Sequence, residues 1–418
     1  MCFWPCCNRV MMVITHLRWT TSQGVGNVSR LKPQDGSTIW TYDLGYHNGN
    51  TNHPRIPGRV KIDEDGNVYV AWQVQKQLGD IAPSGGVTKL SKNGALIWQV
   101  QFPNTSELEQ FSTQPPLLVI DPTDENNVYA TSLKYNAAQQ MVHKLDGESG
   151  GIVLSLAPTL PPATISKSIA GLSMDSVGEF HVIPAFSTSA VYFTKFRSDG
   201  SIVYDWSSVS WLPNVFSVNR MAAACDPNTN SLIFGSPNSG VVSFPLFNKL
   251  LSAQPGPSVP TAYSWRKSLS DFLPPETGML FGSWQLPAPE IVWDIVHTGS
   301  RVIFGTSVVT FRETTAAGIP VQTHAYNLWG LDPGNGDRIF NERIPADSRS
   351  ARQVRSMAYD SSSGILLVAM DGGNDALVNG EQRGNPVLRL TAGLGEIWTV
   401  NPCLSGTISC RGCDVRTL

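Results

Sequence analysis

A hairpin that ends on an aromatic or aliphatic side chain recurs along the whole chain, and this repeat constrains the fold more than any other feature. In the first copy, a strand ending at Leu31 leads through a turn at Gly36 into a second strand that reaches Trp40. Glycine suits such a turn because it adopts positive φ without the steric cost that a β-carbon brings. Further copies place the turn glycine and the final apolar residue at Gly94 and Trp98, Gly150 and Val153, Gly200 and Tyr204, Gly336 and Phe340, and Gly395 and Trp398.

A second hairpin alternates with the first. In its clearest copy, Asp63 opens a turn that Gly66 closes, and apolar residues of strand length lie on both sides. Aspartate favours this position because its carboxylate accepts hydrogen bonds from nearby backbone amides. The other copies follow at intervals of about 50 to 70 residues. They centre on Asp121, Asp175, Asp226, His297 and Asp360.

Two alternating hairpins supply four antiparallel strands per repeat, which is the make-up of one β-propeller blade. Six complete pairs follow Gly58, and residues 28–44 hold one additional outer hairpin. We expect residues 10–19 and part of residues 407–410 to complete that blade, because a ring closed by both ends of the chain has no exposed inner strand edges. The sequence therefore predicts an all-β fold, a single β-propeller of seven four-stranded blades, with six or eight blades as alternatives.

This interpretation divides the chain into three parts. A tail covers residues 1–9, the propeller covers residues 10–403 with an insertion at residues 251–289, and a second tail at residues 404–418 can contribute the closing strand. Although 418 residues would ordinarily suggest about three domains, the repeat favours one ring. The fifth blade is the weakest of the series, because it lacks the glycine–aromatic signature.

The spacing of leucine, glycine and tryptophan in these hairpins resembles the repeat of the PQQ-like (quinoprotein-type) β-propellers over residues 28–401. The resemblance implies structural roles for the tryptophans that dock neighbouring blades and for the glycines of their turns. These residues are Trp40, Trp98, Trp398, Gly36, Gly94 and Gly395. A quinoprotein also needs a glutamate, asparagine and aspartate set that holds the quinone and calcium, and the sequence offers no convincing set. We therefore predict no cofactor.

The sequence contains no H-E-x-x-H, G-x-S-x-G, Walker or G-x-G-x-x-G motif. His47 and His53 share a loop but have no third ligand near them in the sequence. The start of a calcium loop at Asp63 lacks the acidic residue that such a loop needs at Val74. We predict no catalytic, cofactor-binding or metal-binding residue.

Six of the seven cysteines lie near the two ends of the chain, and Cys225 alone is internal. A metal or disulfide clasp between the termini is one interpretation, and free thiols in frayed tails are the other. No apolar run reaches the length of a membrane helix, and the N-terminus does not resemble an export signal.

Loop lengths distinguish the two faces of the predicted ring. The turns within each hairpin are tight, whereas the connections between hairpins are long and include prolines, of which the chain has 29. Long loops on a rigid scaffold commonly carry function, although loops can also lengthen without function at little cost in stability. Trp265 and Trp284 lie in the longest of these loops and are candidate partner-contact residues.

Charged residues make up only 15% of the chain and the net charge is −3, which argues against nucleic-acid or polybasic membrane partners. We expect a non-enzymatic docking propeller in a large assembly, whose partners are other protein subunits. A bacteriophage virion, in its tail, is the expected assembly and location, put together in the host cytoplasm. The alternatives are a PQQ- and calcium-dependent oxidoreductase and an envelope assembly scaffold.

Overall fold

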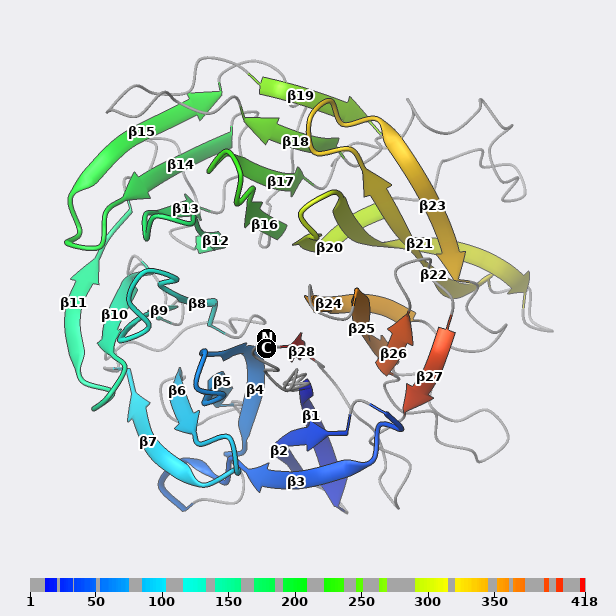
Figure 1. Cartoon of the computed structure of the whole chain (residues 1–418). Helices are drawn as coiled ribbons and strands as arrows, with labels where there is room; N and C mark the ends of the chain where they lie inside the picture. The colour runs from blue at the N-terminus through cyan, green and yellow to red at the C-terminus, as the bar shows by residue number, and fades with distance from the viewer. Residues whose placement is uncertain are drawn as a thin grey trace, which may run out of the picture.

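The computed structural model describes the chain in the following segments: residues 12–20, 23–32, 34–49, 53–74, 85–102, 116–132, 140–158, 169–184, 191–208, 222–236, 246–250, 263–268, 290–314, 320–344, 352–360, 364–372, 387–390, 396–400 and 414–417. These residues form seven antiparallel sheets of four strands each. The sheets stand radially around one axis (Figure 1). The predicted seven-bladed β-propeller is confirmed.

Within blades 2 to 4 the strands follow the chain from the inner to the outer position, whereas in blade 1 the C-terminal strand β28 is innermost. Blade 1 contains β28 (Asp414–Thr417), β1 (Met12–Thr20), β2 (Gln23–Leu31) and β3 (Thr38–Asp43), and blade 2 contains β4 (Arg55–Ile62), β5 (Val68–Val74), β6 (Gly85–Leu90) and β7 (Leu96–Gln101). Blade 3 contains β8 (Leu118–Ile120), β9 (Asn127–Thr131), β10 (Val142–Asp146) and β11 (Ile152–Leu156), and blade 4 contains β12 (Ile169–Met174), β13 (Phe180–Pro184), β14 (Val191–Phe196) and β15 (Ile202–Ser208).

The remaining three blades have the same order. Blade 5 contains β16 (Ala222–Cys225), β17 (Leu232–Ser236), β18 (Leu246–Leu250) and β19 (Tyr263–Ser268). Blade 6 contains β20 (Glu290–His297), β21 (Val302–Thr314), β22 (Pro320–Leu331) and β23 (Arg338–Ile344), and blade 7 contains β24 (Arg352–Asp360), β25 (Ile365–Gly372), β26 (Val387–Leu390) and β27 (Glu396–Val400). A 3-10 helix, η1 (His47–Gly49), lies between blades 1 and 2.

Both ends of the chain close the ring in blade 1, as expected. The C-terminal strand β28 pairs antiparallel with β1, from Met12 opposite Thr417 to Thr15 opposite Asp414. The closing strand is therefore residues 414–417 and not the expected residues 407–410, which lie outside the described segments. The correction has a simple cause, because a strand of four residues carries too weak a pattern to be placed from the sequence alone.

Turn chemistry explains why the hairpins form where they do. The carboxylate of Asp63 accepts a hydrogen bond of 2.7 Å from the Asn67 amide, and Gly66 follows with a φ of 84°. Positive φ is favourable for glycine and costly for most other residues. In the outer hairpin of the same blade, Gly94 has a φ of 82°. The face that holds these two turns and their equivalents in the other blades is called the turn face below.

A β-bulge interrupts every blade at the same place, between the third and the outer strand. In blade 2, Lys89 lies opposite Trp98 and Leu90 lies opposite Leu96, so that Ile97 is the extra residue. The equivalent extra residues are Ile39, Val153, Val203, Ser264, Ile339 and Ile397. Since a bulge increases local twist and disturbs the ladder, this repetition turns each outer strand at the edge of its sheet.

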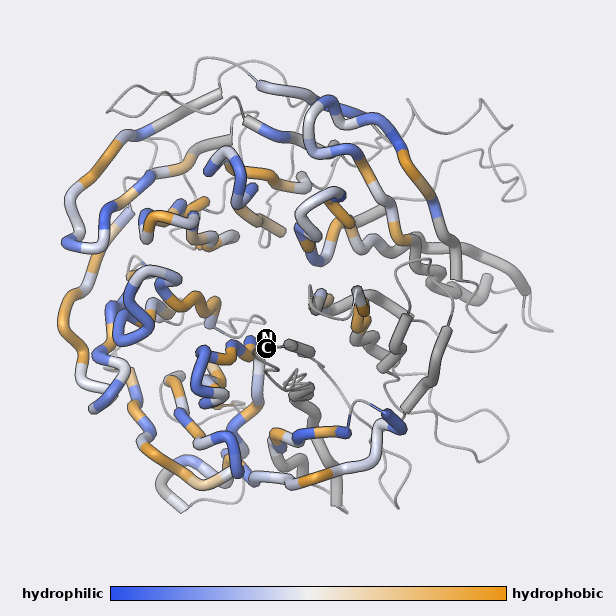
Figure 2. Tube along the Cα trace, viewed as in Figure 1, coloured by the Kyte–Doolittle hydropathy of each residue, from blue (hydrophilic) through white to orange (hydrophobic). Residues whose placement is uncertain are grey.

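The core lies between neighbouring blades and not within one sheet. Val28 of blade 1 packs with Val60 and Trp72 of blade 2 in one cluster, and all three are completely buried. Figure 2 shows apolar stretches along the strands and hydrophilic stretches at many of the turns. Each blade therefore depends on its neighbours for burial.

Three expectations about the long connections need correction. Residues 309–323 are mostly strand, because β21 and β22 extend from the blade as one hairpin that pairs as far as Thr314 and Pro320. The insertion at residues 251–289 contains β19, the outer strand of blade 5. Residues 45–57 contain η1 and the start of β4, and most of the remaining long connections lie outside the described segments.

Candidate functional site

The innermost strands of blades 2 to 7 enclose a central channel with a volume of about 520 Å³. One residue from each strand, the last before its turn, contributes to a belt around this channel. The belt consists of Ile62, Ile120, Met174, Cys225, Val296 and Tyr359, and all six are partly exposed. A volume of this size is within the range of pockets that bind small molecules. The belt is mainly apolar, and Cys225 and Tyr359 provide its polar atoms.

An ion pair spans the channel wall between blades that are not neighbours. Arg59 of β4 lies 3.7 Å from the Asp294 carboxylate of β20, measured from Nη1 to Oδ2. The same Oδ2 accepts hydrogen bonds from the Met357 amide at 2.7 Å and the Ser356 hydroxyl at 3.1 Å, both in blade 7. Asp294 therefore joins blades 2, 6 and 7 and balances the charge of Arg59 in the channel.

Cys225 is the one belt residue with a nucleophilic atom. Its Sγ lies 3.6 Å from Nδ1 of His181 and accepts a hydrogen bond of 3.4 Å from the Ser173 hydroxyl. On the other side of the imidazole ring, Nε2 of His181 lies 3.0 Å from the hydroxyl of Tyr204. The sulfur, the imidazole and the phenol thus form one connected chain from the channel to the outer strand of blade 4.

Burial sets the protonation of this chain. Desolvation raises the pKa of Cys225 to about 12. Desolvation, with a smaller contribution from Lys195, lowers the pKa of His181 to about 3. At neutral pH both groups are therefore uncharged, and the pair is a thiol and a neutral imidazole.

On the turn face, the outer hairpins of blades 1 and 2 are attached to the following blade by paired donors. The indole Nε1 of Trp40 and Nη1 of Arg30 both donate to the Lys92 carbonyl at 3.0 Å. In blade 2, Nε1 of Trp98 donates at 3.0 Å and Nζ of Lys89 at 2.8 Å to the Gly147 carbonyl. We call each such arrangement, a cation and an indole on one carbonyl oxygen of the next blade, an inter-blade clamp.

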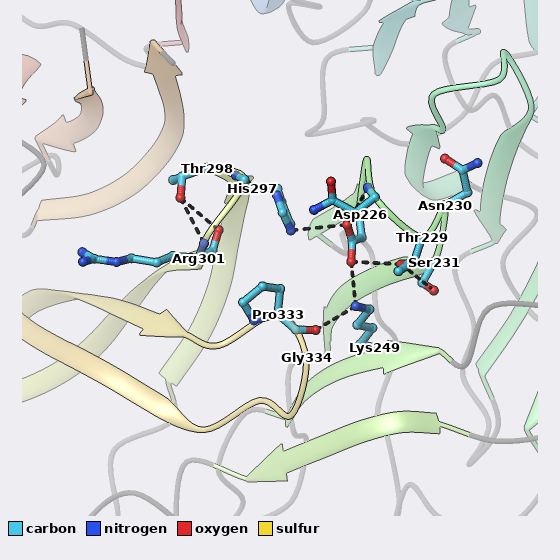
Figure 3. A network of polar contacts seen from close by, with 12 residues as sticks. Asp226, Thr229, Asn230, Ser231, Lys249, His297, Thr298, Arg301, Pro333 and Gly334 are labelled. Carbon is cyan, nitrogen blue, oxygen red and sulfur yellow. Dashed lines mark hydrogen bonds and ion pairs between the residues drawn. The ribbon is translucent and has the colours of Figure 1, made fainter. Parts of the chain in front are cut away.

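Blade 5 has the same clamp, with charged neighbours around it (Figure 3). Nζ of Lys249 donates to the Pro333 carbonyl at 2.7 Å. Nε1 of Trp265 donates to the same carbonyl at 3.0 Å. Lys249 also donates to Oδ2 of Asp226 at 2.6 Å, and Nε2 of His297 lies 3.5 Å from Oδ1 of Asp226. The Asp226–Lys249 pair is almost completely buried within blade 5, and the contacts of Lys249 with Pro333 and of Asp226 with His297 link it to blade 6.

Two protonation states follow from this network. The amide of Gly299 donates to Nδ1 of His297, so the neutral imidazole carries its proton on Nε2, which faces Asp226. Burial lowers the pKa of His297 despite the opposing effect of Asp226. Burial raises the pKa of Asp226, but the hydrogen bond from Lys249 and those from the turn outweigh it, so that the net shift is downward.

The indole of each clamp packs against a turn glycine of the next blade. A β-carbon at Gly94 would lie 2.8 Å from the Trp40 ring, and one at Gly150 would lie 2.8 Å from the Trp98 ring. Gly336 stands in the same relation to Trp265, at 2.7 Å. The indole rings therefore lie directly on the turn glycines of the next blade.

The predicted residues are placed as follows. Trp40, Trp98, Gly36 and Gly94 belong to outer hairpins, with Trp40 resting on Gly94. Trp398 lies opposite Arg389 in the strand register, and Gly395 and Trp284 lie outside the described segments.

The prediction for Trp265 is wrong. It is 5% exposed and serves as the clamp indole of blade 5, because 12 residues that lie outside the described segments separate β18 from β19 where other blades have a tight turn.

The cation of the clamp was missed in the sequence, although a signal was present. A lysine or arginine directly precedes the leucine or phenylalanine of the repeat in six of the seven copies. These residues are Arg30, Lys89, Lys144, Lys195, Lys249 and Arg389. Lys144 donates to the Ser198 carbonyl of blade 4 at 3.0 Å, which extends the pattern to blade 3. Lys195 instead pairs with Asp175 and Glu179 of its own blade, at 2.8 and 2.6 Å.

The residues considered for metal binding have structural contacts. His47 and His53 are both buried in the connection from β3 to β4, where the His47 amide donates to the His53 carbonyl. Burial, Arg55 and His53 together lower the pKa of His47. Within the described segments, no three histidine, cysteine or acidic side chains gather as a metal site. The same segments include no helix with the length and apolarity to span a membrane.

Comparison with known proteins agrees on the fold. A scan against protein-family models and a search of curated protein sequences each gave no match. Among solved structures, a protein from Lactobacillus plantarum aligns at a TM-score of 0.50 and 12% identity, covering 98% of this chain and 99% of that one. A candidate 6-phosphogluconolactonase from Bacteroides fragilis NCTC 9343 aligns at 0.51 and 8%, again covering 98% and 99%. The WD40 repeats of RRP9 align at 0.49 and 10%, covering 95% and 96%. At these identities the likeness to the first two shows the fold alone, which agrees with the ring of seven four-stranded sheets.

Proposed function

We propose that this protein is a non-enzymatic docking propeller in a large assembly. The observation that carries the proposal is a row of exposed aliphatic side chains on the outer strands, close to the bulges. We call it the outer aliphatic row. It consists of Ile39, Ile97, Val153, Ile202 and Ile339, which are 45%, 46%, 62%, 47% and 45% exposed.

The position of the row favours contact with protein. Four of its members lie on blades 1 to 4, which follow one another around the ring, and Leu96 and Ile152 add exposed apolar surface beside it. Single exposed aliphatic residues are common on protein surfaces, so it is their repetition at or beside the β-bulge of successive blades that favours a protein contact. The inter-blade clamps support the same function, because a scaffold with fixed blades presents its surface in one arrangement.

The partners are proposed to be other protein subunits, which the outer aliphatic row contacts together with the long loops of the face opposite the turn face. The proposed assembly is a bacteriophage virion, formed in the host cytoplasm. Two features of the sequence support the proposed virion assembly: only 15% of the residues are charged, and catalytic and metal-binding motifs are scarce.

The test is whether the protein occurs in large particles. Lysates of cells that produce it naturally should be separated by sedimentation, and fractions containing the protein should be imaged by electron microscopy. We expect the protein in particles far heavier than its own 45.4 kDa. Recovery only as a free monomer under gentle extraction would contradict the proposal.

A matched pair of variants then tests the surface. Replacing Ile39, Ile97 and Ile339 with serine should remove the protein from the particles while leaving its unfolding midpoint almost unchanged, because these side chains are already half exposed. The control replaces Gln101 and Asn341, exposed polar residues on β7 and β23, with serine. The control should still assemble, and equal assembly of both variants would contradict the role of the row.

A further inference from the structure

Three observations on Cys225 bear on its chemistry. The residue is partly exposed and is among those that line the central channel, its Sγ lies 3.6 Å from a ring nitrogen of His181, and that ring is held on its far side by Tyr204 at 3.0 Å. A nucleophile beside a base, with the base oriented by a third group, is the arrangement that activates hydroxyl and thiol nucleophiles. Both His181 and Tyr204 are well buried, so the orientation of the base is fixed by the blade.

We propose that Cys225 is an acyl-accepting nucleophile in the channel wall, with His181 as its proton acceptor and Tyr204 as the residue that positions His181. The acyl donor is a small activated ester or thioester. The acyl group stays on Cys225, so this acylation is a stoichiometric modification and not a catalytic turnover. It is separate from the docking function and does not depend on it.

The cavity defines which donors fit. Ala222, Ala223 and Ala224 precede Cys225 on the same strand and line the channel with it, and Met174 lies in the same wall. Small and apolar neighbours favour a short apolar acyl group. The channel volume of about 520 Å³ limits the donor to a small molecule.

The reaction step uses only groups that are present. The sulfur attacks the carbonyl carbon of the donor, and the thiol proton passes to Nδ1 of His181. The bond between the carbonyl carbon and the leaving oxygen or sulfur then breaks, and the leaving group takes the proton from His181. The products are S-acyl Cys225 and the free alcohol or thiol, so that the atoms balance without a further reactant.

The tautomer required by this step agrees with the contacts. For Nδ1 to accept a proton, the neutral imidazole must carry its own proton on Nε2, and Nε2 faces the Tyr204 hydroxyl at 3.0 Å. The charged groups that act on the pair are Asp175, Lys195 and Asp226, and Glu179 acts on Tyr204. The resting pair is uncharged, so the proton moves during the attack and not before it.

This mechanism gives a distinctive pH profile. Because neutral His181 is the proton acceptor, the acylation rate of Cys225 should be nearly constant from about pH 6 to about pH 9. Attack by a free thiolate would instead make the rate rise about tenfold per pH unit, since the thiol is far from its pKa throughout this range.

The experiment uses the full chain with 4-nitrophenyl acetate as donor. Release of 4-nitrophenol gives the rate, and peptide mass mapping locates the acetyl group, which distinguishes Cys225 from the six cysteines near the chain ends. We expect acetyl-Cys225 in the folded wild type, with a flat pH profile. His181→Asn should lower the Cys225 rate at least tenfold at neutral pH and make it rise with pH. Tyr204→Phe should lower the rate several-fold without changing the shape of the profile.

His143→Asn is the matched control, because His143 is also buried and its Nδ1 lies 2.8 Å from a hydroxyl, that of Ser155, but it lies in blade 3 away from Cys225. This variant should acylate at the wild-type rate. Absence of acetyl-Cys225 in the folded wild type, or a wild-type rate that rises tenfold per pH unit, would overturn the proposal. If His181→Asn does not fold, the wild-type pH profile and the Tyr204→Phe rate still decide it.

Discussion

Lys89 and Trp98 lie opposite each other on neighbouring strands, and their nitrogen atoms donate to the same carbonyl oxygen, that of Gly147 in the next blade. Neither side chain could make this contact within its own sheet. The pair therefore links strand register to ring assembly: the β-bulge at Ile97 rotates the outer strand so that Trp98 and Lys89 reach the same acceptor.

The first prediction concerns the indole donor. Trp98→Phe removes the Nε1 hydrogen bond to Gly147 but leaves the Lys89 bond and much of the ring contact in place. The free energy of unfolding should fall by about 1–2 kcal/mol, whereas Trp98→Ala should cost about 3–5 kcal/mol. Chemical denaturation followed by circular dichroism measures both. Equal losses for the two variants would contradict a separate contribution of the hydrogen bond.

The second prediction separates the clamp from backbone strain. Gly150 and Gly299 both have positive φ, 75° and 89°, but a β-carbon at Gly150 would meet the Trp98 ring at 2.8 Å, whereas one at Gly299 would meet nothing within 4 Å. Alanine at Gly299 should therefore cost only the backbone penalty of about 1 kcal/mol. Alanine at Gly150 should cost that penalty and also displace the indole.

Thermal and chemical unfolding of Gly150→Ala and Gly299→Ala give the comparison directly. We expect Gly150→Ala to be less stable than Gly299→Ala by at least about 1 kcal/mol. If both variants lose the same stability, the indole does not depend on the turn glycine.

The third prediction concerns the buried ion pair of blade 5. Lys249→Met would leave the Asp226 carboxylate buried with its turn hydrogen bonds but without its cation at 2.6 Å. Removing one partner of a buried pair costs about 3–5 kcal/mol, and replacing both costs much less. The double variant Asp226→Asn with Lys249→Met should therefore be more stable than Lys249→Met alone. A double variant that loses the sum of the two single losses would contradict the pairing.

The fourth prediction is a dependence of stability on pH. Burial lowers the pKa of His181 from 6.5 to about 3, so below pH 6.5 the unfolded chain binds a proton that the folded protein does not bind. Neutral His181 therefore makes its full contribution to the free energy of unfolding above pH 6.5, and this contribution decreases as the pH falls toward 3. In that pH range, His181 changes the free energy of unfolding by about 1.4 kcal/mol per pH unit.

His181→Asn should remove this contribution to the pH dependence of the free energy of unfolding. Burial also lowers the pKa of His47, His143 and His297, so these groups leave a residual slope in the variant. Denaturation midpoints measured from pH 7 down to pH 4 give the two slopes. Equal slopes for wild type and variant would show that His181 accepts a proton in the folded state.

Much of the fold could be predicted because the signals were repeated and local. Aspartate and glycine turns recur in blade after blade, and their order predicts four strands per unit. The repeat does not reveal Trp265, because the connection before it is long and the glycine turn is missing. A strand as short as β28 has too few residues to show a pattern.

The site was harder to predict, because it arises from contacts across blades. Cys225, His181 and Tyr204 belong to three strands of two blades and are 44 and 23 residues apart along the chain. Nothing in their local sequence indicates that they meet. The clamp cations were visible as a basic residue before the leucine or phenylalanine of the repeat in six of the seven copies. Their function depends on a carbonyl in the next blade, which only the folded ring brings close.

The last prediction concerns the junction where the chain closes its ring. Arg389 lies opposite Trp398 in the register that Lys89 and Trp98 have in blade 2, and the β-bulge falls at the same place. This shared register predicts a clamp between blade 7 and the outer turn of blade 1. After β27 the chain enters blade 1 only through the short strand β28, so this interface depends on non-covalent contacts and on the β28–β1 pairing. Trp398→Ala should therefore lower the unfolding midpoint at least as much as Trp98→Ala and should increase hydrogen exchange in β1 and β28 first. A variant as stable as wild type would exclude Trp398 from the clamp.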